Sequence, residues 1–190
     1  MAGLLVRLGR GGRPAPGSGG NDSFVLADPY RDNLLTSDGP RWGRIVEGAG
    51  EDPYLGSVLA AARVRGFQGD DLRKPDAVLA TAKHFVAYGA AEAGRDYNVA
   101  DISERTLHEV YLPPFKAAVD AGAQSIMASF NEIAGVPMHA HRPLIQDLLR
   151  KEWGWDGLLV SDYTGVMELM PHGVAADREQ AGALGLRAGV

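Results

Sequence analysis

Short apolar runs that end at polar residues recur along this chain and alternate with helix patterns. The last run passes from Leu158 through Val160 to a serine and then to Asp162. So continuous an apolar run is typical of a strand buried on both faces, as in a parallel sheet covered by helices. Two further strands are predicted over residues 79–85 and 125–130. The alternation predicts a parallel α/β fold and places Asp162 at the carboxyl end of a strand, where such folds gather their chemistry.

Helix signals fill the segments between these strands. Asp52 and Pro53 suit the cap and the first turn of a helix that we expect to end at Gly66. A later helix is expected to break at Pro113-Pro114, because proline lacks an amide hydrogen and its ring clashes with the preceding turn. The predicted helices, in chain order, are residues 52–66, 103–112, 113–120 and 143–154.

The first 36 residues differ in composition from the rest. Residues 1–22 hold seven glycines, two prolines and three arginines, a mixture that cannot bury enough apolar area to offset the entropy of ordering. We expect residues 1–36 to form a glycine-rich, disordered leader and residues 37–190 to form one domain. A complete (β/α)8 barrel takes ~250 residues, and this chain shows about half of its units. The predicted fold is therefore α/β, a partial TIM-barrel-type parallel barrel truncated at both ends.

The charge balance and the composition exclude several classes of partner. The chain has 19 basic and 24 acidic residues, a net charge of −5, and no basic stripe that would follow phosphates, so no nucleic acid partner is expected. No apolar run approaches the ~20 residues of a membrane helix, so no membrane partner is expected either. With no cysteine, the chain has no thiolate nucleophile and no sulfur ligand for a metal.

Asp162 has two interpretations. An aspartate that precedes a helix most often caps it, because capping needs only an oxygen beside free amide hydrogens. Alternatively, its carboxylate is a nucleophile for an anomeric carbon, since it is ionised at neutral pH and leaves again as a stable anion. The polar residues at the other strand ends favour the second interpretation, which predicts a sugar-cleaving site.

Four cationic side chains are candidate companions of Asp162. In an ideal strand Lys83 and His84 point to opposite faces, so only an irregular strand end lets both reach one ligand. The structural alternative gives Lys83 an ion pair and His84 a hydrogen bond within the core. Arg44 and Arg95 each have two interpretations as well. The guanidinium either binds vicinal hydroxyls of a sugar or stabilises a loop through hydrogen bonds.

Apolar and imidazole side chains provide weaker signals. Met127 and Phe130 are most simply core residues at a strand end, and an apolar wall beside a sugar ring is their second interpretation. His139 and His141 form the one close pair among five histidines, which is a weak case for a metal. We expect neither a metal site nor a cofactor.

Several short motifs add a more specific signal through their order. They are Pro40-Arg41-Trp42-Gly43-Arg44, Glu51-Asp52-Pro53, Lys83-His84-Phe85, Gly94-Arg95-Asp96, Ser129-Phe130-Asn131, Trp153-Gly154-Trp155 and Val160-Ser161-Asp162-Tyr163. Over residues 38–190 this order resembles family 3 glycoside hydrolases, particularly the β-glucosidase and β-xylosidase branch. The resemblance identifies the chain as a fragment of the N-terminal barrel domain of such an enzyme.

The resemblance implies retaining hydrolysis of terminal β-D-glycosidic bonds, with Asp162 as the nucleophile and a β-linked oligosaccharide or glycoside as the substrate partner. The positions that match sugar-binding residues of the family are Arg44, Lys83, His84, Arg95, Met127, Phe130 and Tyr163. The glutamate that serves as acid/base in the family belongs to a second domain and is expected to be missing from this chain. A periplasmic or extracellular location is also implied, although the first residues form no clear signal peptide.

Two alternatives remain. A catalytically inactive carbohydrate-binding or assembly remnant would keep Lys83, His84 and Arg95 and would gain nothing from Asp162. An aldolase-type barrel would use Lys83 as a Schiff-base amine. Because barrel strands would be left unpaired and the acid would be absent, we expect the isolated chain to show little turnover, and either to self-associate or to need the missing domain as a partner.

Overall fold

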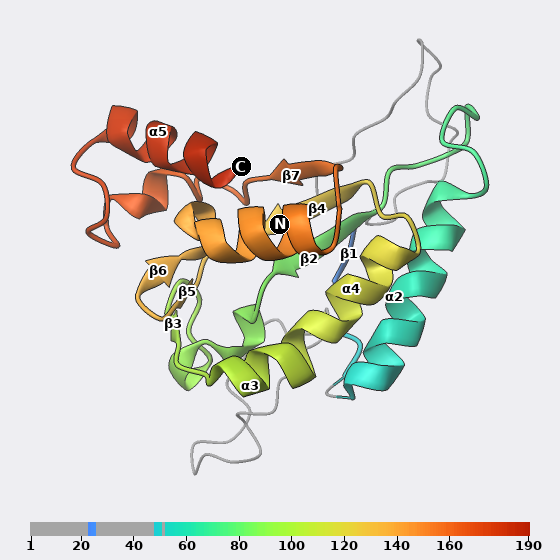
Figure 1. Ribbon diagram of the computed structural model, residues 1–190, viewed down its shortest axis with the longest axis horizontal. Helices are drawn as coiled ribbons and strands as arrows, with labels where there is room; N and C mark the ends of the chain where they lie inside the picture. Colours follow the sequence, from blue (N-terminus) through green and yellow to red (C-terminus); the bar gives the residue numbers. More distant parts are fainter. Residues whose placement is uncertain (1–22, 26–47, 51) are drawn as a thin grey trace.

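The computed structural model describes residues 23–25, 48–50 and 52–190, and within them the larger of two sheets has four parallel strands (Figure 1). They lie in the order β1 (Ser23–Val25), β2 (Thr81–Phe85), β4 (Ser125–Ala128) and β7 (Leu158–Val160). The three strands predicted from the sequence are present. Their parallel pairing confirms the α/β layout.

Helices connect these strands and pack against them. The main ones are α2 (Pro53–Gln68), α4 (Leu112–Asp120) and η6 (Pro143–Glu152), of which η6 has π-type hydrogen bonds. α2 and α4 lie side by side (Figure 1). Val64, Phe115 and Ile145, one from each helix, join Ile126 of β4 in a single buried cluster. The three helices and the sheet therefore share one core.

The first of these helices begins as predicted but ends later. Asp52 accepts two backbone N–H groups of the first turn. The prediction that Gly66 ends the helix is wrong, because α2 continues to Gln68 and is capped by Gly69. Gly69 has φ = 65°, a backbone conformation that residues with a side chain rarely adopt and that favours glycine. The side chain of Gln68 donates to the carbonyl of Gly122, so a tertiary contact supports the extra turn.

The break expected at Pro113-Pro114 does not occur. The chain stays helical from α3 (Glu104–Thr106) through η4 (Leu107–Tyr111) into α4. η4 is a π-type turn, and its wider hydrogen-bond spacing leaves room where a proline ring would otherwise clash with the preceding carbonyl. The prolines lie in the first turn of α4, directly after this π-type turn.

Strand β1 lies inside the segment 1–36 for which we expected a disordered leader. Residues 23–25 pair in parallel with residues 81–83 of β2. Pairing with a neighbouring strand supplies backbone hydrogen bonds that composition alone does not reveal. The expectation does not hold at these three residues, and the rest of the segment lies outside the described residues.

Aromatic contacts join β2 to the helices. The ring of Phe85 is fully buried and meets the rings of Phe115 and Trp153 edge-on, with centroids 5.2 and 6.4 Å apart. Nearby, the indole N–H of Trp155 donates to the carbonyl of Ala123 at 2.6 Å. These contacts fix the segment that leads from η6 into β7.

A second sheet of three short strands combines one strand before β4 with two after it. β5 (Glu132–Ile133) pairs in parallel with β3 (Val99–Ala100) and forms an antiparallel hairpin with β6 (Val136–Pro137). The remaining helical segments are η2 (Tyr88–Ala90), η3 (Glu92–Gly94), η5 (Met138–Ala140), η7 (Met167–Leu169) and α5 (Arg178–Ala188). Over the described ranges, no helix is both long and apolar enough to cross a membrane.

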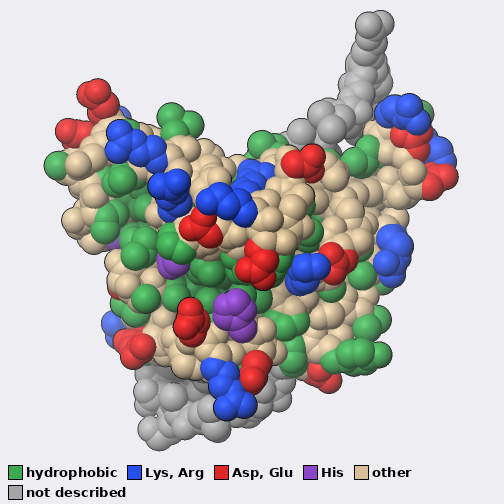
Figure 2. Space-filling view, in the orientation of Figure 1, with side chains coloured by type: hydrophobic (Ala, Val, Ile, Leu, Met, Phe, Trp, Pro, Cys, Tyr) green, Lys and Arg blue, Asp and Glu red, His purple; other side chains and the backbone are tan. Residues whose placement is uncertain are grey.

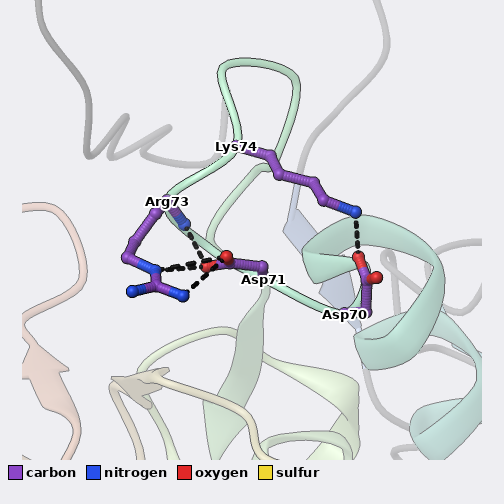
Figure 3. A network of polar contacts seen from close by, with 4 residues as sticks. All are labelled: Asp70, Asp71, Arg73 and Lys74. Carbon is purple, nitrogen blue, oxygen red and sulfur yellow. Dashed lines mark hydrogen bonds and ion pairs between the residues drawn. The ribbon is translucent and has the colours of Figure 1, made fainter.

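Charged side chains are spread over the surface. In the connection between α2 and β2, Arg73 pairs with Asp71 at 2.8 Å and Lys74 with Asp70 at 2.5 Å (Figure 3). Such exposed pairs are screened by water and salt and add little to the stability of the fold. On the face shown in Figure 2, acidic and basic residues are interspersed and form no single-sign patch.

Candidate active site

The pairing of β2, β4 and β7 brings predicted site residues onto one face of the sheet. Lys83 lies opposite Met127, which in turn lies opposite Val160. Residues paired across neighbouring strands point to the same face, and their chain neighbours Ala82 and Ile126 point into the core shared with the helices. Lys83 and Met127 are 2% and 6% exposed. They are therefore buried together on the face that the shared core does not use.

An irregularity at the end of β2 changes the direction of His84. Lys83 pairs with Met127 and Phe85 pairs with Ala128, so His84 is an extra residue on β2, as in a β-bulge. The Lys83–His84 and Phe85–Val86 peptide bonds are cis. The register shift is an irregularity of the kind that the sequence analysis required, and contact of Lys83 and His84 with one ligand stays a prediction.

Asp162 follows β7 and begins a turn instead of capping an α-helix. Its Oδ1 accepts the backbone N–H of Tyr163 at 2.6 Å, and its carbonyl accepts the N–H of Gly165 at 3.0 Å. Its Oδ2 lies 3.5 Å from Nε2 of His84, and the side chain is only 10% exposed. The structure therefore joins two predicted site residues, Asp162 from β7 and His84 from β2.

His139 contacts the backbone of Asp162, a role that the sequence analysis missed. Its Nε2 accepts the backbone N–H of Asp162 at 3.2 Å, so this nitrogen carries no proton. Burial of the ring lowers the pKa of His139 to about 4; a hydrogen bond to the backbone of Ser129 opposes this shift, and His172 adds to it. The ring is thus neutral at pH 7. In the sequence, only its spacing from His141 marked this residue.

The low pKa of His139 predicts that stability falls in acid. The pKa is 6.5 when the ring is unperturbed and about 4 in the folded protein. The unfolded chain therefore binds a proton at a higher pH than the native one, and the stability contributed by the neutral ring is fully present above pH 6.5. It is lost as the pH falls towards 4, by about 3 kcal/mol in total. Urea unfolding at pH 7 and pH 4 measures the loss.

The variant His139→Gln separates this titration from that of other groups, because glutamine does not titrate. Its unfolding free energy should change less between the two pH values than that of the unchanged protein. Burial also lowers the pKa of His141, which therefore contributes in the same direction in both proteins. An identical pH dependence in both would contradict the assignment to His139.

The two histidines that formed the weak metal signal both bind backbone groups. Nδ1 of His141 accepts the N–H of Leu144 at 3.3 Å, while Nε2 of His139 is occupied by Asp162. Among residues 23–25, 48–50 and 52–190, no group of three or more histidine, cysteine, aspartate or glutamate residues is arranged to hold a metal ion.

The segment after β4 supports the end of β2. Ser129 and Asn131 are fully buried, and both donate side-chain hydrogen bonds to the carbonyl of Val86, at 3.3 and 3.2 Å. Between them, Phe130 is 1% exposed and packs against the rings of Tyr97 and Tyr88. Phe130 thus occupies a core position, and its contact with a sugar stays a prediction.

The other predicted residues are more exposed or lie elsewhere. Tyr163 is 70% exposed beside Asp162, and Arg95 is exposed after η3. Arg44 lies outside the described residues. Their roles in sugar binding also stay predictions.

Comparisons with known proteins show which family shares these features. Residues 35–190 match the family model of the glycosyl hydrolase family 3 N terminal domain. A β-xylosidase of Formosa agariphila is 47% identical over 167 residues, which are 85% of this chain and 23% of the relative. A periplasmic β-glucosidase of Salmonella typhimurium is 44% identical over 151 residues, which are 80% of this chain and 20% of the relative.

Solved structures agree with the sequence comparisons. The crystal structure of a β-glucosidase from Listeria innocua matches with a TM-score of 0.77 and 40% identity, over 88% of this chain and 22% of the other. The chain spans about a fifth of the length of these proteins. The family model covers most of the sequence, and relatives this similar extend over most of it, so the chain belongs to glycosyl hydrolase family 3, as the order of its motifs predicted.

Proposed function

We propose that this chain is part of a retaining β-glycosidase in which Asp162 is the nucleophile. The observation that carries the proposal is the placement of its carboxylate, which accepts the N–H of Tyr163 and lies 3.5 Å from His84 at the end of β7. A nucleophile must meet one carbon from one direction, and a carboxylate held at a strand end suits that requirement. The β-glucosidase and β-xylosidase names of the relatives support a glycosidic substrate.

In the proposed reaction, an oxygen of Asp162 bonds to the anomeric carbon while the glycosidic oxygen leaves with its electron pair and takes up a proton. Water then cleaves the glycosyl ester and restores the carboxylate, with net retention of configuration. A second carboxyl group ~5–5.5 Å from the first must supply the proton. We assign none of the described acidic residues to that place and propose that this group lies outside the 190 residues.

The proposal gives the surrounding side chains defined roles. Arg44, Lys83, His84 and Arg95 hold sugar hydroxyls, Met127 and Phe130 line the site, and Tyr163 stacks on the ring. The shared face of Lys83 and Met127 and the proximity of His84 to Asp162 support these roles. An exposed aromatic ring such as Tyr163 offers an apolar surface to the C–H groups of a sugar.

We also propose that residues 37–190 are part of a (β/α)8 barrel. In such barrels the helices cover the outer face of the strands, and the other face points inward to the barrel axis. The single core shared by α2, α4, η6 and the sheet supports this arrangement. So does the opposite face, where Thr81, Lys83 and Ser125 are buried polar residues.

The proposed substrate has a terminal β-linked glucose or xylose unit. The relatives include both a β-glucosidase and a β-xylosidase, and the Listeria innocua enzyme has been solved with glucose. Both sugars present equatorial hydroxyls, which hydrogen-bond donors such as Lys83 and His84 can hold. They differ in one exocyclic hydroxymethyl group, so covalent labelling should be compared with a β-glucoside and a β-xyloside reagent.

A dinitrophenyl β-glycoside with fluorine in place of the hydroxyl next to the anomeric carbon is expected to label Asp162 covalently. Dinitrophenolate leaves without protonation, so the reaction does not depend on the general acid. The fluorine slows the second displacement more than this activated first one, so the glycosyl ester accumulates. Mass spectrometry of the intact protein should show one added glycosyl unit, and peptide mapping should place it on Asp162.

Two variants make this labelling specific. Asp162→Asn should remain unlabelled, whereas Asp156→Asn, which changes an exposed aspartate just before β7, should label as the unchanged protein does. Sugar binding without a covalent adduct would instead support the rival function of a carbohydrate-binding or assembly remnant.

A further inference from the structure

We propose that His139 is a positioning residue for the nucleophile, because the hydrogen bond from the backbone N–H of Asp162 to its Nε2 fixes the turn that carries the carboxylate. This inference rests on the proposed role of Asp162. His139 lies on η5, which follows the hairpin of the second sheet and precedes η6. It therefore anchors the turn after β7 to a different part of the fold.

The ring of His139 is held on several sides. Nε2 accepts the backbone N–H of Asp162, and the backbone of Ser129, just after β4, lies near enough to the ring to influence its pKa. The ring of Phe130 packs against it, with centroids 6.2 Å apart and planes inclined by 35°. His139 is 1% exposed. A buried imidazole whose Nε2 accepts a hydrogen bond and whose ring is packed against an aromatic neighbour has little freedom to turn, so it can define a position.

Gly165 brings the turn into direct contact with the ring. A Cβ atom at Gly165 would lie 2.2 Å from both Cε1 and Nε2 of His139. The N–H of Gly165 bonds to the carbonyl of Asp162, so both residues belong to the same turn. The backbone of Gly165 is not in the left-handed region, and the close approach to His139 is therefore the reason for a glycine here. The turn and the imidazole fit one another without room for a methyl group.

Such an anchor matters because catalysis depends on the place of the attacking oxygen. A misplacement of ~1 Å between reacting groups can cost ~100-fold in rate. Without the imidazole, the turn keeps its local bonds from Tyr163 and Gly165 to Asp162. It loses its connection to η5.

The test measures covalent labelling by the dinitrophenyl fluoro-glycoside in the full chain. His139→Leu removes the acceptor of the Asp162 N–H at similar volume, and we expect the maximal labelling rate to fall ~10- to 100-fold while the half-saturating concentration changes less than ~3-fold. His139→Gln retains an acceptor and a donor and should recover most of the rate. A merely structural role would not produce this split between rate and binding.

His141→Leu is the matched control. His141 also accepts a backbone N–H, but that N–H belongs to Leu144 in η6. Its loss should lower the thermal stability and leave the labelling rate unchanged. An equal fall in rate in this variant and in His139→Leu would overturn the inference, because general destabilisation would explain both.

Gly165→Ala tests the same contact without changing the imidazole. The new methyl group must displace His139 or the turn, so this variant should also label ~10- to 100-fold more slowly. Its effect should not add to that of His139→Leu in the double variant, because both act through one contact. If His139→Leu does not fold, Gly165→Ala and His139→Gln decide the question.

The outcomes separate this inference from the proposed function. Labelling of both His139→Leu and Gly165→Ala at the unchanged rate, with Asp162 labelled normally, overturns the positioning role alone. No labelling of Asp162 in the unchanged protein overturns the proposed function and the positioning role with it.

Discussion

Replacing Asp162 by glycine is expected to lower the rate of dinitrophenyl β-glycoside cleavage by about 10⁴- to 10⁶-fold, the range found when one member of a nucleophilic catalytic set is removed. Added azide is expected to restore part of the rate, since a small anion fits the space left by the carboxylate and attacks the anomeric carbon itself. One displacement inverts the configuration, so the product should be an α-glycosyl azide. Dinitrophenolate release gives the rate, and NMR of the product gives its configuration.

The matched control for this experiment is Asp156→Gly, which removes an exposed carboxylate from the same segment. It should cleave the glycoside at the unchanged rate and show no response to azide. Azide that accelerates both variants alike, or a β-configured azide product from Asp162→Gly, would contradict the nucleophilic role of Asp162.

The variant Phe85→Ala is expected to lower the free energy of unfolding by about 3–5 kcal/mol. Phe85 is fully buried and its ring contacts Phe115 of α4 and Trp153 after η6. Truncation therefore removes apolar burial and leaves a cavity where strand and helices meet. Urea unfolding followed by tryptophan fluorescence measures the loss, and Trp153 is well placed to report it.

An exposed aromatic residue provides the comparison. Tyr54 is 77% exposed in the first turn of α2, so Tyr54→Ala should change the unfolding free energy by less than about 0.5 kcal/mol. Similar losses of unfolding free energy in both variants would contradict the large contribution of the buried Phe85 ring to the stability of the core.

Helix starts could be predicted from the sequence because they depend on local chemistry. Asp52 caps α2 through its own side chain, and a cap of this kind needs only neighbouring residues. The end of the same helix depends on Gln68, which bonds to Gly122 far away in the chain. The choice between Gly66 and Gly69 was therefore decided by tertiary contacts, which a local pattern does not contain.

Only part of the site could be predicted, because the rest depends on how distant segments of the chain pair and pack. The alternation of strands and helices placed Asp162 at a strand end, and parallel pairing then brought it near His84. The direction of His84 depends on a register shift between β2 and β4, which no single strand encodes. The contact of His139 with Asp162 joins residues 23 positions apart through the fold, and His139 was weighed only as a metal ligand.

The extra residue in β2 interrupts the pairing with β4 but does not change how the strand fills the core. Lys83 and Phe85 point to opposite faces, as consecutive residues of a regular strand would. A strand one residue shorter, without His84, would therefore fill the same core and pair with β4 without interruption. The additional residue therefore adds nothing to the core, and it places an imidazole nitrogen 3.5 Å from the carboxylate of Asp162.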